Sequence, residues 1–184
     1  MWLRYLTICS LCAALTQLLP GAWILAKAEL AQVLIARAWS AEGAAKPWPW
    51  ADTWPVLRLQ APHLGVDLYV LEGGQGNALA FGPGRMPQVG DQPPAGSQPP
   101  ALLIAGHRDT HFRFLQELRA GDSLRLRAKQ GGWQRWRVDS VAIVDSRHQA
   151  LKPVAAGLLL VTCYPFEALR AGGPLRYVVT ALPH

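Results

Sequence analysis

Residues 158–166 read LLLVTCYPF, an apolar run that ends on a cysteine and is followed by a turn-forming proline. Four successive apolar residues of this kind are typical of a short buried strand. The thiol of Cys163 would then lie at a strand end, where a sheet offers a rigid support for a reactive group. A cysteine in this setting is either a small buried hydrophobe or a nucleophile, and composition does not choose between the two.

Short apolar or alternating runs recur through the chain after Thr53, and glycines and prolines separate them. The densest break is the loop GPGRMPQVGDQPPAGSQPP over residues 82–100, and one brief helical patch covers residues 110–118. Seven or eight short strands with so little helix predict an all-β barrel or sandwich over residues 53–184. The expected strands are residues 55–60, 64–71, 101–105, 124–129, 133–138, 141–144, 158–162 and 177–182.

The N-terminal stretch from Tyr5 to Ala26, YLTICSLCAALTQLLPGAWILA, contains no charged residue. As a helix it is long enough to cross a bilayer core of about 30 Å. A cleaved signal peptide is the alternative, because Ala26-Lys27-Ala28 is similar to a small-x-small cleavage site. The apolar run is longer than a usual signal-peptide core and continues into the helical sequence KAELAQVLIARAW. We therefore expect residues 1–26 to be an uncleaved transmembrane helix.

Residues 27–52 are predicted to form a juxtamembrane helix followed by a tether. The composition changes over residues 40–52, SAEGAAKPWPWAD, which are rich in Ala, Pro and Trp. The predicted barrel or sandwich domain is then expected to cover residues 53–184. One side of the juxtamembrane helix would lie at the membrane interface, and it comprises Leu30, Val33, Leu34 and Trp39.

The chain of 184 residues has a formal net charge of +6, and after Ser40 it holds 15 Lys and Arg against 11 Asp and Glu. Such a balance suits nucleic acid, anionic lipid or plain solubility. The basic residues form no known nucleic-acid motif, so no nucleic-acid partner is expected. Two of the three cysteines, Cys9 and Cys12, belong to the apolar N-terminal stretch, which leaves Cys163 alone in the predicted barrel.

Three side chains suited to acyl transfer are expected at strand ends. Cys163 ends LLLVTC, His107 follows LLIAG, and Arg176 opens the last strand in GPLRYVV. A thiolate is a strong nucleophile, an imidazole can protonate a leaving amine, and a guanidinium can stabilise an oxyanion. The spacing alone leaves open a buried cysteine with a surface histidine and arginine. His107 and His111 stand four apart, but without an HExxH glutamate no metal site is expected.

The joint pattern resembles the sortase family. LLLVTC with a downstream arginine resembles the sortase TLxTC signature, AGHR resembles its histidine motif, and the order His, Cys, Arg is that of sortases. The resemblance implies an eight-stranded β-barrel with short helices, preceded by an N-terminal transmembrane helix. Further segments are similar to one branch, the sortases of Gram-negative proteobacteria: KAELAQVLIARAW, LGVDLYVLEG, LAFGPG, AGHRDTHFRFL, VTCYPF and GGPLRYVV.

The resemblance also implies roles for individual residues. Cys163 would be the nucleophile that forms a thioacyl enzyme, and His107 the general acid and base. Arg176 would steady the substrate backbone and the oxyanion, with Arg170 in the EALRAGG loop as the second choice. The sequence departs from the signature at Leu159, which replaces the leading threonine. A side chain that far up the strand points elsewhere, so we expect catalysis to be unaffected.

The implied function is that of a membrane-anchored cysteine transpeptidase. It would cleave a C-terminal LPxTG-like sorting signal in a partner protein and transfer the product to an amine, without a cofactor. The expected location is the inner membrane, with a single span in the lipid and the barrel in the periplasm. Two alternatives remain: a thiol endopeptidase that only hydrolyses its target, and an inactive peptide-binding module. A binding groove needs none of the three reactive side chains, which argues against the last.

Overall fold

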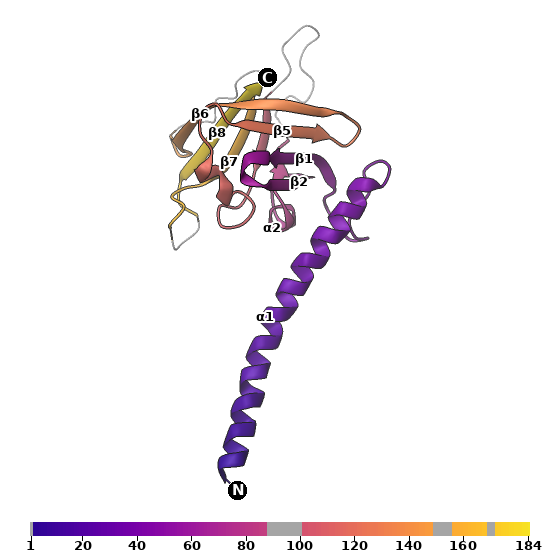
Figure 1. Cartoon of the computed structure of the whole chain (residues 1–184), viewed down its shortest axis with the longest axis vertical. Helices are drawn as coiled ribbons and strands as arrows, with labels where there is room; N and C mark the ends of the chain where they lie inside the picture. Colours follow the sequence, from indigo (N-terminus) through magenta and orange to yellow (C-terminus); the bar gives the residue numbers. More distant parts are fainter. Residues whose placement is uncertain (1, 88–100, 149–155, 169–171) are drawn as a thin grey trace.

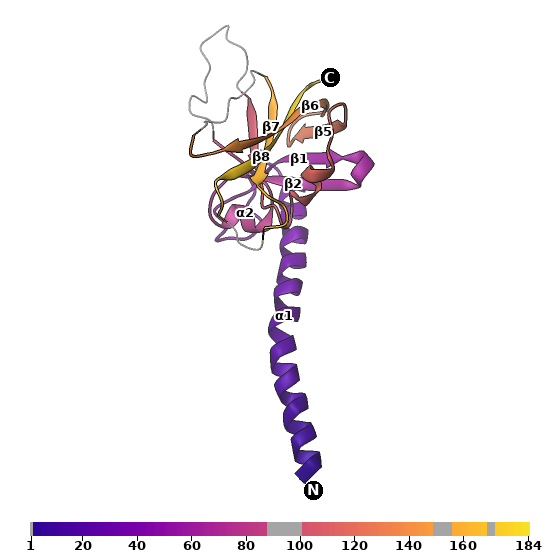
Figure 2. The same cartoon turned by 90° about the vertical axis from the view of Figure 1, so that its left-hand side faces the viewer.

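The computed structural model describes residues 2–87, 101–148, 156–168 and 172–184, and most side chains between residues 6 and 25 lie outside this description. A long helix, α1 (Trp2–Ser40), extends from a β-barrel, with the chain's N-terminus at its far end (Figure 1). The view turned by 90° shows the same arrangement, with the C-terminal end of α1 beside the barrel (Figure 2).

Eight strands close into one barrel in the order β1-β2-β3-β4-β7-β8-β6-β5, and β5 pairs with β1. The pairs β2–β3 and β4–β7 are parallel and the others antiparallel, so the sheet is mixed. The predicted eight-stranded barrel with short helices is confirmed. The elements are β1 (Pro55–Ala61), η1 (Pro62–Leu64), β2 (Val66–Glu72), α2 (Asn77–Phe81), β3 (Gly84–Arg85), β4 (Leu102–Ala105), η2 (Arg113–Glu117), β5 (Ser123–Ala128), β6 (Trp133–Asp145), β7 (Leu158–Cys163) and β8 (Leu175–Pro183).

Two errors in the predicted strands offset each other. The runs predicted as separate strands at 133–138 and 141–144 are one strand, β6, whose register shifts between Val138 and Ser140. Such a bulge interrupts the alternation of side chains and makes one strand look like two. Conversely, β3 lies inside the predicted loop 82–100, because a strand of two residues has no detectable pattern. Residues 88–100 of that loop lie outside the described residues.

β7 is buried on both faces, which explains its unbroken apolar sequence. Leu158 and Leu160 belong to the main core inside the barrel. Leu159 and Val161 alternate with them and belong to a second cluster, which also includes Val178 of β8. This second cluster lies on the outer face of the sheet, because successive side chains of a strand point to opposite faces.

The C-terminal part of α1 packs against the barrel. Ile35 is 1% exposed and forms a buried cluster with Leu71 of β2 and Ala78 of α2. Of the side predicted for the membrane interface, Leu30 and Val33 are exposed. Trp39 of that same set instead contacts the ring of Tyr69, at 5.7 Å between ring centroids.

The predicted tether also contacts the barrel. The Trp48 ring packs edge-on against Phe81, 4.9 Å between centroids, and Ala51 is buried. Lys129, at the end of the β5 hairpin strand, donates hydrogen bonds to the carbonyl oxygens of Ala38 (2.7 Å) and Gly43 (2.6 Å). The domain boundary placed after Asp52 stays a prediction.

In the part of the chain that the structure describes, no helix is both long and apolar enough to count as a membrane span. The span predicted for Tyr5 to Ala26 consists largely of residues whose side chains lie outside that part, and it stays a prediction.

Candidate active site

The predicted nucleophile is the last residue of β7, and the predicted base lies two residues past the end of the neighbouring parallel strand β4. The Gly106 N–H extends the β4–β7 ladder by donating to the Val161 carbonyl (3.1 Å). The buried Thr162 hydroxyl donates to the Gly106 carbonyl at 2.7 Å. His107 directly follows Gly106, and Cys163 directly follows Thr162. The structure therefore brings the imidazole and the thiol to the same edge of the barrel.

The backbone of His107 is fixed by the turn that follows it. Its carbonyl oxygen accepts hydrogen bonds from the N–H groups of Phe112 (3.0 Å) and Thr110 (3.4 Å). The fully buried Phe112 ring lies against Gly106, where an added Cβ would be 2.7 Å from Cγ of the ring. The imidazole itself is exposed to solvent. A rigid backbone thus presents a side chain that can exchange protons with water.

Cys163 is a half-buried free thiol at the last position of β7. Its direct partner in the antiparallel β7–β8 ladder is Arg176. Directly paired residues point to the same face of a sheet, so the thiol and the guanidinium share one face. Val161 and Val178, the pair two positions along, are on that face too. Both valines are buried, so the thiol lies at the edge of a packed apolar cluster.

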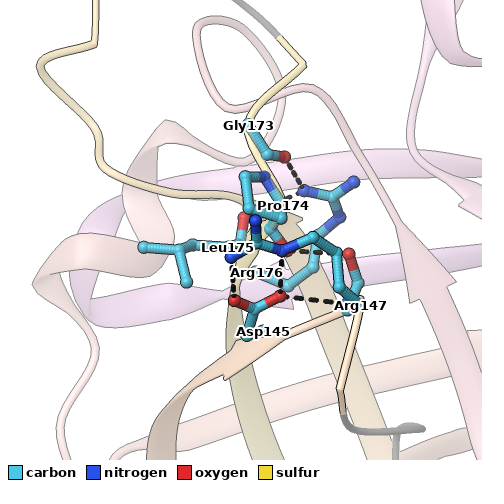
Figure 3. Close-up of polar contacts among 7 residues, drawn as sticks. Asp145, Arg147, Gly173, Pro174, Leu175 and Arg176 are labelled. Atoms are coloured by element: carbon cyan, nitrogen blue, oxygen red, sulfur yellow. Dashed lines mark hydrogen bonds and ion pairs between the residues drawn. The ribbon is translucent and has the colours of Figure 1, made fainter.

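The Arg176 guanidinium contacts peptide carbonyl groups (Figure 3). Its Nη1 donates to the carbonyl oxygens of Gly173 (2.6 Å) and Leu175 (2.9 Å). Ser146, just past β6, holds the same turn by donating from its N–H (3.0 Å) and its hydroxyl (2.7 Å) to the Pro174 carbonyl. The Nη1 group of Arg176 is thus held by carbonyls of its own turn.

The end of β6 beside this turn is fixed by an ion pair. The Arg147 side chain binds the Asp145 carboxylate through Nε (3.1 Å) and Nη2 (2.7 Å), and its backbone N–H adds a third hydrogen bond (3.0 Å) (Figure 3). These hydrogen bonds lower the pKa of Asp145 to about 2. Asp145 pairs with Leu175 at the start of β8. The ion pair therefore helps to fix the position of Arg176, the next residue of that strand.

A second arginine, Arg108, lies buried beside the site, and sequence reasoning did not single it out. Its guanidinium is 6% exposed and forms two hydrogen bonds to the Asp109 carboxylate (2.8 and 3.0 Å). It also donates to the backbone carbonyls of Pro165 and Ala168 (the latter at 2.8 Å), which follow Cys163 in the chain. An arginine in a polar segment after a strand gives no sequence signal for burial.

An aromatic cluster follows the cysteine. The rings of Tyr164, Phe166 and Tyr177 contact one another, with centroid separations of 5.1 to 6.2 Å. Burial raises the pKa of Tyr177, and the nearby Tyr164 adds to the shift. The cluster packs partly on the barrel core, so it supports the segment after the nucleophile.

Two other sequence candidates have different outcomes. Arg170, the second choice for the catalytic arginine, lies outside the described residues. His111 is half-buried, and burial lowers its pKa. Within the described ranges, no three His, Cys, Asp or Glu side chains gather into a metal-binding group.

The fold and site together define a class: a closed mixed β-barrel that presents a thiol, an imidazole and a guanidinium at one edge. Residues 59–184 match the model of the sortase domain. Sortase D of Bacillus subtilis (strain 168) is 32% identical over 129 residues, which are 66% of this chain and 60% of that protein. The chain therefore belongs to the sortase family, a family of cysteine transpeptidases.

Solved structures support the same fold. Sortase A from Corynebacterium diphtheriae has a TM-score of 0.57 at 22% identity, covering 73% of this chain and 63% of that one. A sortase D5 transpeptidase from Clostridium perfringens has a TM-score of 0.55 at 19% identity, covering 71% and 79%. Sortase A of Listeria monocytogenes has a TM-score of 0.58 at 18% identity, covering 71% and 87%. These named relatives are Gram-positive sortases, so the resemblance to the proteobacterial branch stays a prediction.

Proposed function

We propose that this chain is a membrane-anchored sortase of the Gram-negative class. It cleaves a C-terminal LPxTG-like sorting signal in a partner protein and transfers the new carboxyl end to an amine. The observation that carries the proposal is the convergence of three strand ends: His107 follows the hydrogen-bonded end of β4, Cys163 is the last residue of β7, and Arg176 is paired with Cys163.

The first half of the reaction breaks the peptide bond. The Cys163 thiolate attacks the scissile carbonyl carbon, and a C–S bond forms. Arg176 donates hydrogen bonds to the oxyanion or to an adjacent substrate carbonyl. The C–N bond then breaks, and the His107 imidazolium gives its proton to the leaving amine. The product is a thioester on Cys163.

The second half reverses these roles. An acceptor amine attacks the thioester carbonyl, and neutral His107 takes the proton that the amine loses. Sulfur leaves as the thiolate, which restores the enzyme. If water attacks instead, the net reaction is hydrolysis. The first half leaves His107 neutral, so it can accept the proton of the acceptor amine, and the cycle ends with the imidazolium and the thiolate restored.

The substrate class follows from the surface around the thiol. Cys163 is half-buried at the end of β7, and the valines that share its face, Val161 and Val178, are buried, so a flexible peptide can reach the thiol more easily than a folded surface can. Arg176 already binds peptide carbonyls, which favours an extended peptide backbone as the ligand. Both features suit a short linear signal better than a folded protein surface.

Membrane anchoring is supported by the sequence and by the helix. The uncharged stretch from Tyr5 to Ala26 would span roughly 33 Å as a helix, against a bilayer core of about 30 Å. α1 continues from this stretch to Ser40 and projects from the barrel (Figure 1). Anchoring enzyme and substrate in one inner membrane, with the barrel in the periplasm, raises their effective concentration.

The test is a product assay on the purified full-length chain. A peptide with an LPxTG-like signal is incubated with and without an added amine such as triglycine, and the products are identified by mass spectrometry. We expect amine-dependent ligation after cleavage. Cleavage to the free acid alone would favour the endopeptidase alternative, and binding without cleavage would favour the binding module.

Cys163→Ala is the matched control for that assay. It should abolish cleavage and leave the melting temperature nearly unchanged, because a half-buried side chain at a strand end contributes little packing. Cleavage at the wild-type rate would contradict the mechanism. A large loss of stability would instead indicate that the cysteine is a packing residue.

The location is tested separately in a Gram-negative host. The full chain should pellet with inner membranes after alkaline carbonate washing. Protease added to spheroplasts should digest the barrel, because it would face the periplasm. Recovery in the soluble fraction, or protection until the membrane is lysed, would contradict the proposed topology.

A further inference from the structure

The buried guanidinium of Arg108 has no part in the mechanism above, although it lies beside the catalytic residues. With 6% of its side chain exposed, it is one of only three polar or charged residues buried among those the structure describes. Burying a cation is costly unless it is paired and hydrogen-bonded. Four hydrogen bonds, two to Asp109 and one each to Pro165 and Ala168, offset that cost.

The position of these partners is informative. Arg108 directly follows His107, and the segment from Pro165 to Ala168 begins two residues after Cys163. One guanidinium therefore joins the backbone that carries the base to the backbone that carries the nucleophile. A planar fork with several donors can hold two carbonyls and a carboxylate at once, whereas a lysine ammonium cannot reproduce that geometry.

The two charges of the Arg108–Asp109 ion pair differ in their exposure to solvent. The Asp109 side chain is 65% exposed, so water screens the carboxylate, while the cation is buried. The hydrogen bonds to Asp109 raise the pKa of Arg108, and attraction to Cys163 and Glu167 raises it further. The guanidinium also binds the carbonyl of Pro165, two residues after Cys163, so its positive charge lies near the thiol.

We propose that Arg108 is a positioning residue of the sortase reaction. It fixes the Pro165–Ala168 segment against the strand end of His107, and it places a buried positive charge near the sulfur of Cys163. This inference rests on the proposed function for its kinetic part. Its electrostatic part concerns the thiol alone and is measurable without a peptide substrate.

The kinetic test compares Arg108→Gln, Arg108→Lys and the exposed control Arg119→Gln, all in full-length chains. Peptide cleavage is measured over a range of substrate concentrations. We expect both Arg108 variants to lose kcat by roughly a hundredfold, because a displacement of about 1 Å in reacting groups has that effect. KM should change little, since Arg108 is not proposed to touch substrate. The control should match wild type.

The electrostatic test uses alkylation of Cys163 in a Cys9→Ser, Cys12→Ser background. Rates with anionic iodoacetate and neutral iodoacetamide are measured, and the modified residue is identified by peptide mass spectrometry. A buried cation favours the anionic reagent, so the iodoacetate-to-iodoacetamide rate ratio should fall several-fold in Arg108→Gln. The ratio should stay close to wild type in Arg108→Lys, which keeps the charge, and in Arg119→Gln.

The outcomes separate the two proposals. Wild-type kcat in either Arg108 variant, or an unchanged alkylation ratio in Arg108→Gln, overturns this inference while leaving the proposed function intact. If the wild-type chain cleaves no peptide, the proposed function fails, and the alkylation ratio still decides the electrostatic part. Should Arg108→Gln fail to fold, Arg108→Lys decides: low kcat with a preserved ratio supports the inference, and wild-type kcat overturns it.

Discussion

Gly106 controls how closely the strand end of His107 packs on the turn that follows it. An added Cβ would lie 2.7 Å from the Phe112 ring, which is fully buried and cannot move away freely. We expect Gly106→Ala to destabilise the fold by about 1–3 kcal/mol, the usual cost of overpacking. Activity should fall as well, because the shift is passed directly to His107.

Thermal unfolding and peptide cleavage check this prediction. Gly132→Ala is the matched control, because nothing lies within 4 Å of the Cβ that it would add. The control should be neutral in both assays. Equal melting temperatures for the two variants would show that the Phe112 ring adjusts without cost.

The catalytic arginine is also a question for single residues. We expect Arg176→Lys to lower turnover by about 3 kcal/mol in transition-state stabilisation, or roughly a hundredfold, because a lysine loses the planar fork. Arg170→Lys should have a mild effect, since only Arg176 is paired with Cys163 in the sheet. Both variants are compared with wild type in peptide cleavage, with circular dichroism to verify folding. An inactive Arg170→Lys beside a normal Arg176→Lys would reverse the assignment.

At the scale of elements, the junction of β6 and β8 should make stability depend on pH. The pKa of Asp145 is about 2 in the folded chain, against an ordinary value of 3.8, because Arg147 binds the carboxylate. A lowered pKa stabilises the fold above about pH 4, and this contribution is lost as the pH falls from about 4 to 2. Asp145→Asn has no carboxylate to protonate at this position, so this loss of stability at low pH should be absent from the variant.

Thermal melts of wild type and Asp145→Asn between pH 7 and pH 2.5 provide the measurement. Wild type should be more stable at pH 7, and the difference should shrink below pH 4. Asp139→Asn, on the exposed part of the same strand, is the control. A constant difference across the range would mean that the ion pair does not anchor this junction.

The elements also show what sequence can predict. The LLLV run of β7 was identifiable because a strand buried on both faces needs apolar residues throughout. The same pattern placed Cys163 and His107 at strand ends. β3 was missed because a strand of two residues is too short to show an alternating pattern. The bulge in β6 was missed because it interrupts the alternation of side chains along that strand. Arg108 was missed for a different reason. Its burial depends on carbonyls that only the tertiary fold brings together.

At the scale of the whole molecule, α1 has two parts: one extends away from the barrel and the other packs against it. Its N-terminal part extends away from the strands in both views (Figures 1 and 2). Its C-terminal part buries Ile35 against Leu71, and the Ala38 carbonyl accepts a hydrogen bond from Lys129, whose ammonium also binds the Gly43 carbonyl just past the helix. A structural division of α1 is therefore expected near residue 27, where the predicted anchor ends.

Two truncations test that division. Removal of residues 1–26 should give a water-soluble chain with wild-type peptide cleavage, because every barrel contact of Ile35 and Lys129 is kept. Removal of residues 1–52 should still give a folded chain, because the barrel closes without α1. It should nevertheless be less stable by a few kcal/mol, since full burial of one side chain such as Ile35 contributes about 1.5–3 kcal/mol. Urea unfolding of both chains measures the difference. Equal midpoints would show that residues 27–52 are a mere tether, and failure of the longer truncation to fold would move the domain boundary into α1.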